Sequence, residues 1–247
     1  MLPNTIQSKQ MNNKIQNLHL PPVIAQAYEA AANELITALN PKIFFGYFSV
    51  CSDGKGHGNN TTFPGLDWGQ SAEALMWLGR KAEVLASWEY VKNFQSEDGL
   101  LPFAILPDLA GKDINMDNKY PMKIMPNGAV FIHWVPGNPL RTLANITFLM
   151  LAEAIFAYTN DIRWLEKQAS SLEKAVHWLK SQINGEELMH GGGFYVERPT
   201  RLEFDGVNQC YSYHTMLLAT SLFKKLGKDK LADESKEAAL LLKNLQF

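Results

Sequence analysis

The chain has 247 residues, 46% of them hydrophobic, so it can bury the core of one large domain or of two small ones. Its 23 basic and 25 acidic residues are spread without blocks, which excludes the basic surface of a nucleic-acid-binding or membrane-binding protein and favours a neutral ligand. Two cysteines, Cys51 and Cys210, exclude a disulfide framework and a cysteine-rich zinc site.

The first 20 residues lack the basic and then apolar pattern of a signal peptide, and no later stretch reaches the roughly 18 apolar residues of a membrane span. We therefore expect a cytoplasmic protein with an N-terminal extension (1–20) and one structural domain (21–247).

Helical periodicity begins after Pro21, a residue type that is common at the start of a helix. From there, apolar residues recur at helical spacing in separate segments. The expected helices cover residues 22–39, 67–78, 82–95, 139–158, 162–182, 208–226 and 230–245.

After the first helix, the expected helices pair into three antiparallel hairpins because only two or three residues separate the members of each pair. The turns are centred on Gly79, Asn160 and Gly227. In each hairpin the first helix is apolar on most faces and the second has a charged stripe, so we expect inner first helices and outer second helices. The repeat predicts an all-α fold with almost no sheet.

One long connection precedes each hairpin (41–66, 96–138 and 184–207), and the alternation places all of them at the end where the inner helices start. They combine aromatic residues, carboxylates, arginines and amides. This mixture suits a sugar, whose C–H faces stack on rings and whose hydroxyls need fixed polar partners. Within the last connection, residues 191–196 and 200–204 are expected to pair as a short hairpin.

Two carboxylates recur at the start of inner helices, Asp67 in "GLDWGQ" and Asp205 in "LEFDGVNQ". Both positions suit a helix N-cap, and both suit chemistry at the loop-rich end. A carboxyl group placed among aromatic side chains such as Trp134 loses hydration, which raises its pKa and suits it to donate a proton near neutrality. Glu203 has the same opportunity, and the two readings, cap and chemistry, stay open.

Other polar and aromatic residues of the connections also have two readings. Glu197 and Arg201 form either a surface ion-pair set or a sugar contact. Trp68 and Trp134 are either stacking platforms or part of the core. The residues expected to hold substrate are Asp67, Trp68, Gln70, Trp134, Glu197 and Arg201.

No metal and no cofactor are expected. The segment "DINMDN" (113–118) begins like a calcium-binding loop, but Asn118 stands where such a loop needs glycine and Ile124 where it needs glutamate. The histidines show no metal-ligand spacing.

Three features together resemble the catalytic domain of the six-hairpin, (α/α)6-barrel glycosidases: the alternation of inner and outer helices, the segment beginning "LDWGQSAEALMW", and the segment "EFDGVNQCYSYHTMLLATSLFKKLG". The similar groups are the bacterial α-L-rhamnosidase-like proteins and the trehalase and processing α-glucosidase group. The resemblance implies an incomplete (α/α)6 toroid of about seven helices and an inverting glycoside hydrolase, in which one carboxylic acid protonates the leaving group and a second carboxylate activates water.

The resemblance also implies roles for particular residues. Asp67 matches the aspartate of a Trp-Asp element that holds sugar hydroxyls, and Asp205 in "EFDG" matches the general acid, ahead of Glu203. The substrate implied is a neutral oligosaccharide or glycoconjugate.

Six hairpins at this spacing need roughly 420 residues, so we expect the N-terminal part of a catalytic barrel that a missing C-terminal half or a second chain completes. Such a part alone is expected to be nearly inactive. The alternative is a non-catalytic helical-repeat protein that binds carbohydrate or another partner.

Overall fold

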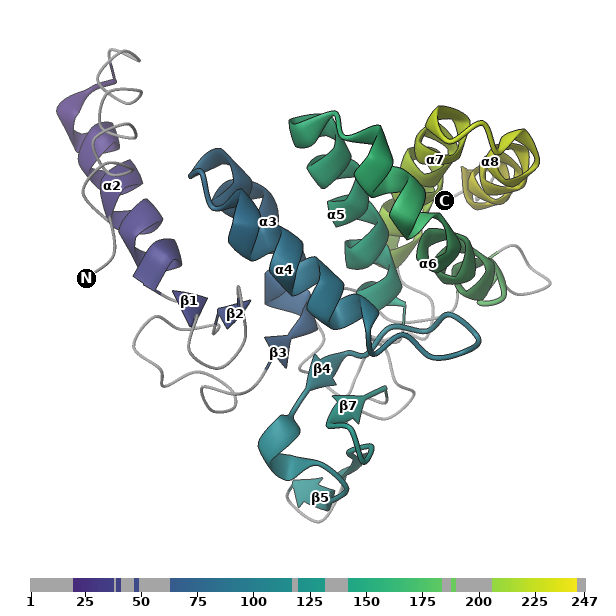
Figure 1. The fold of residues 1–247 in the computed structure, drawn as a ribbon, viewed down its shortest axis with the longest axis horizontal. Helices are drawn as coiled ribbons and strands as arrows, with labels where there is room; N and C mark the ends of the chain where they lie inside the picture. The colour runs from purple at the N-terminus through teal and green to yellow at the C-terminus, as the bar shows by residue number, and fades with distance from the viewer. Residues whose placement is uncertain are drawn as a thin grey trace.

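The computed structural model describes residues 20–37, 39–40, 47–48, 63–116, 120–131, 142–183, 188–189 and 206–243. These ranges are mainly helical, as expected for an all-α protein, and each helical segment expected from the sequence corresponds to one helix (Figure 1). The ends differ by a few residues at most. The helices are α2 (Pro22–Thr37), α3 (Gly65–Trp77), α4 (Lys81–Lys92), α5 (Leu143–Thr159), α6 (Ile162–Lys180), α7 (Gly206–Lys225) and α8 (Asp229–Lys243).

The turns inside the three helical hairpins end each first helix with a residue in the left-handed region. Gly79, Asn160 and Gly227 have φ angles of 80°, 49° and 66°. Glycine adopts this conformation without steric cost, and asparagine tolerates it better than most residues do. After Asn160, the Asp161 carboxylate accepts a hydrogen bond of 3.0 Å from the backbone N–H of Trp164 and caps α6. The predicted short turns are therefore confirmed.

Helices α3, α5 and α7 form a central row. Helix α5 packs against α3 on one side and α7 on the other, and also against α6. Most of its residues are buried, including the polar residues Asn145 and Thr147. The apolar first helices of the hairpins are therefore the central ones, as their composition predicts.

The core centres on Trp88 of α4, which is 0% exposed. Its ring stacks on Phe148 of α5 at 4.1 Å between centroids and meets Trp164 of α6 edge to face at 5.3 Å. Burial of an aromatic side chain of this size contributes on the order of 3 kcal/mol, so this cluster is a main tie between the first and second hairpins.

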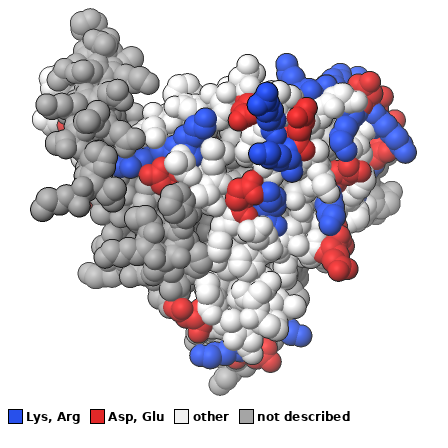
Figure 2. Space-filling model, in the orientation of Figure 1, with Lys and Arg blue, Asp and Glu red and all other residues white. Residues whose placement is uncertain are grey.

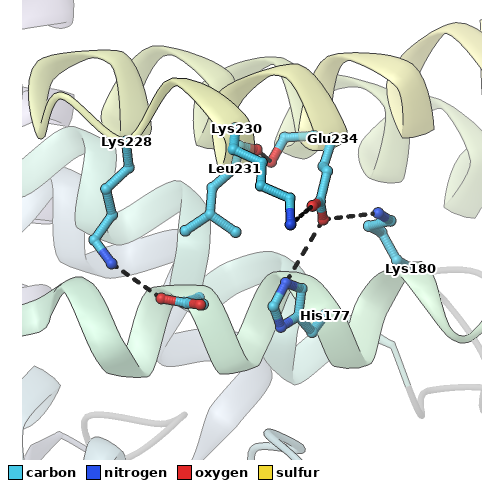
Figure 3. Close-up of polar contacts among 8 residues, drawn as sticks. His177, Lys180, Lys228, Lys230, Leu231 and Glu234 are labelled. Carbon is cyan, nitrogen blue, oxygen red and sulfur yellow. Dashed lines mark hydrogen bonds and ion pairs between the residues drawn. The ribbon is translucent and has the colours of Figure 1, made fainter.

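The second helices of the second and third hairpins, α6 and α8, meet through polar pairs at the surface (Figure 3). Lys180 Nζ donates a hydrogen bond of 3.2 Å to Glu234 Oε2, and Lys228 Nζ donates one of 3.0 Å to Glu173 Oε2. Figure 2 shows basic and acidic side chains interspersed over these helices, without a large field of one sign. In the ranges described, no helix is both long and apolar enough to span a membrane.

The connections between hairpins contain short strands that the sequence pattern did not indicate. Each has two to four residues, and all their pairings are antiparallel. The segment 113–116, considered above as the start of a calcium-binding loop, is one of these strands. The strands are β1 (Leu39–Asn40) with β2 (Tyr47–Phe48), β3 (Phe63–Pro64) with β4 (Ala104–Ile105) and β7 (Ala129–Val130), and β5 (Asp113–Met116) with β6 (Tyr120–Lys123).

Candidate functional site

The three central helices start at the same end of the molecule. At the starts of α5 and α7, Thr142 Oγ1 donates a hydrogen bond of 2.9 Å to Asn208 Oδ1. At the ends of α3 and α5, the rings of Trp77 and Tyr158 meet edge to face, 5.9 Å between centroids. Helices α3, α5 and α7 are therefore parallel neighbours.

A three-stranded sheet joins the connection that precedes α3 to the connection that precedes α5. Phe63 of β3 pairs with Ile105 of β4, and Ala104 of β4 pairs with Val130 of β7. Figure 1 shows these strands beyond the end of the helices at which α3 begins. Segments that are far apart in the sequence therefore meet at this end.

The side chain of Asn145, in the first turn of α5, binds three backbone groups and is 0% exposed. Its Oδ1 atom accepts a hydrogen bond of 3.0 Å from Leu101 N, and its Nδ2 atom donates to the carbonyl oxygens of Gly99 (2.9 Å) and Ala175 (3.2 Å). The amide therefore ties the connection after α4 to both α5 and α6. The glycosylation sequence Asn145-Ile146-Thr147 cannot be presented to solvent in this fold.

Gly99 lets the same connection lie directly on the backbone of α6. Its φ angle is 98°, and a Cβ atom added to it would lie 2.1 Å from the carbonyl oxygen of Lys174. Only glycine combines this conformation with this close approach.

Gln209, in the first turn of α7, holds the connection that precedes this helix. Its Nε2 atom donates a hydrogen bond of 2.8 Å to the Met189 carbonyl oxygen, and its Oε1 atom accepts one of 2.8 Å from Met189 N. The amide thus pairs with Met189 as a neighbouring strand would. Buried amides and the small sheet therefore fix parts of the connections at the end where the central helices start.

Three of the residues expected to bind substrate, Asp67, Trp68 and Gln70, lie in the first turns of α3. The helix begins at Gly65, directly after Pro64 of β3, and not at residue 67. Asp67 therefore lies inside the first turn and is not the residue that precedes the helix. A carboxylate suits this position because the helix macrodipole is positive at its N-terminal end. The structure does not describe the side chains of these three residues.

The remaining predicted site residues lie outside the described ranges, as does the expected hairpin of residues 191–196 and 200–204. Helix α7 begins at Gly206, so Asp205 comes immediately before it in sequence. The distances among the predicted carboxylates stay predictions. The residues concerned are Trp134, Glu197, Arg201, Glu203 and Asp205.

Sequence reasoning missed a group of buried polar residues on α5 and α7. Besides Asn145 and Gln209, the hydroxyl groups of Ser212 and Thr215 are buried and have no hydrogen-bond partner among the residues that the structure describes. Their signal in the sequence is the run "NQCYSYHT" (208–215), which is unusually polar for a helix with many buried residues. Such groups are costly in an apolar core unless other contacts compensate for their desolvation.

A second missed feature is a set of titratable residues from all three central helices. Burial raises the pKa of the Glu153 carboxyl group on α5, and the neighbouring carboxylate of Glu73 on α3 raises that pKa further. His214 on α7 opposes both effects. The available sequence signal is that Glu153 is the single charged residue of α5. In the ranges described, no group of three histidine, cysteine or acidic residues is arranged to hold a metal ion.

Comparisons with protein-family models, with curated proteins and with solved structures found no match to this chain.

Proposed function

We propose that the chain carries carbohydrate-binding and catalytic groups of an inverting glycoside hydrolase that acts on a neutral oligosaccharide or glycoconjugate. The observation that supports the proposal is the common start of the parallel helices α3, α5 and α7, where β3, β4 and β7 join two of the long connections. Rows of parallel inner helices with outer partners are the repeating part of an (α/α)6 toroid, and loops at one end of a rigid scaffold commonly carry function.

In this proposal Asp205 donates a proton to the oxygen of the leaving group, with Glu203 as the alternative donor. A second carboxylate, about 6.5 to 9.5 Å away across the sugar, takes a proton from the water that attacks the anomeric carbon. Asp67 accepts hydrogen bonds from sugar hydroxyls. The other proposed sugar-binding residues are Trp68, Gln70, Trp134, Glu197 and Arg201.

The test compares hydrolysis of aryl glycosides, whose leaving groups need little protonation, with hydrolysis of neutral oligosaccharides, whose leaving groups need much. In a barrel completed by a C-terminal half or a second chain, Asp205→Asn should slow oligosaccharide hydrolysis by about 10²- to 10⁴-fold and aryl glycoside hydrolysis by much less. Glu203→Gln, measured beside it, decides which residue donates the proton. Asp161→Asn is the matched control because asparagine also caps a helix and Asp161 lies at the opposite end of the helices.

Calorimetric titration with the same oligosaccharides separates catalysis from binding. An enzyme site predicts that Asp205→Asn still binds sugar while Asp67→Asn and Trp134→Ala bind it weakly. Sugar binding without turnover in the completed barrel would favour the non-catalytic alternative. The absence of both binding and turnover with every neutral sugar tested would contradict the proposal.

A further inference from the structure

We draw no further inference here: the strongest candidate, the exposed aromatic surface patch that Trp77 and Tyr158 form at the ends of α3 and α5, carries nothing because no contact within the described ranges shows what covers it.

Discussion

The hydroxyl group of Thr142 donates a hydrogen bond of 2.9 Å to the side-chain oxygen of Asn208, and both residues are buried. Thr142 precedes α5 and Asn208 belongs to the first turn of α7. This bond joins the second hairpin to the third at the end where the proposed site lies.

Thr142→Val keeps the shape of the side chain and removes the donor, so Asn208 loses a buried partner. We expect the free energy of unfolding to fall by about 1 to 2 kcal/mol in urea titrations. Thr220→Val is the matched control because the buried Thr220 hydroxyl donates to Met216 O of its own helix, a bond that adds little to helix stability. Equal losses of unfolding free energy in the two variants would show that the hydrogen bond between hairpins stabilises the fold no more than a bond within one helix.

Asn145→Leu removes three hydrogen bonds at once and leaves Leu101 N and the carbonyl oxygens of Gly99 and Ala175 without this partner. Unsatisfied buried groups cost about 1 to 3 kcal/mol each, so we expect a loss of at least about 3 kcal/mol. Hydrogen exchange gives a local readout, because the amide of Leu101 should lose its protection before the amides of α6 do. Unchanged exchange at Leu101 would contradict the proposed role of Asn145 in holding this connection.

Gly99→Ala and Gly79→Ala form a second matched pair. Both glycines have positive φ angles, but an added Cβ atom meets Lys174 O at 2.1 Å in the first case and nothing within 4 Å in the second. Gly79→Ala should therefore cost about 1 to 2 kcal/mol for the conformation alone, and Gly99→Ala clearly more. Thermal unfolding of both variants measures the difference, and equal shifts would show that the connection moves away from α6 at little cost.

The helices and their hairpin turns could be predicted from the sequence because their signals are local. Apolar periodicity marks each helix, and Gly79, Asn160 and Gly227 stand where a left-handed residue ends one. The carboxylate of Asp67 suits an N-cap and predicts a helix that starts there, whereas α3 starts at Gly65.

The contacts that tie the connections together could not be predicted, because they depend on partners distant in the sequence. Strands β3, β4 and β7 are two residues long, too short for an alternating pattern. Asn145 occurs in a glycosylation sequence, and only the fold shows that its amide binds Gly99, Leu101 and Ala175. The proximity of Glu153 to Glu73 and His214 depends in the same way on the juxtaposition of three helices.

The ion pairs between α6 and α8 should give a small stability that depends on pH and salt (Figure 3). The hydrogen bond from Lys180 lowers the pKa of Glu234, and the charges of Lys180, Lys230 and His177 lower it further. Because the pKa is lower in the folded state, the stabilisation is present above the ordinary glutamate pKa of 4.5 and is lost as the pH falls through the folded-state value.

Glu234→Gln should therefore lower the free energy of unfolding at pH 7 by at most about 0.5 kcal/mol, because these ion pairs lie at the surface, where water screens them, and by less in 1 M salt. Lys230→Ala is the control, since Lys230 lies 4.0 Å from Glu234 with its side chain 91% exposed, and should change nothing measurable. A salt-independent loss in Glu234→Gln would point to packing instead of charge.

The effect of the Glu153 carboxylate on the free energy of unfolding should have the opposite sign to that of Glu234. Its folded-state pKa is raised by burial and by Glu73, so the folded state binds a proton more tightly than the unfolded state. Above the folded-state pKa the carboxylate is charged in both states and destabilises the fold. As the pH falls toward the ordinary value of 4.5, the folded state takes up a proton first and this destabilisation disappears.

Glu153→Gln should consequently raise the free energy of unfolding at pH 7 by less than about 1 kcal/mol, after discounting for solvent screening, and should have no effect below pH 4.5. Glu237→Gln, an exposed position on α8, controls for the loss of one negative charge. Equal effects of Glu153→Gln and Glu237→Gln on the free energy of unfolding at pH 7 would contradict the prediction, because they would show that burial and Glu73 do not destabilise the Glu153 carboxylate.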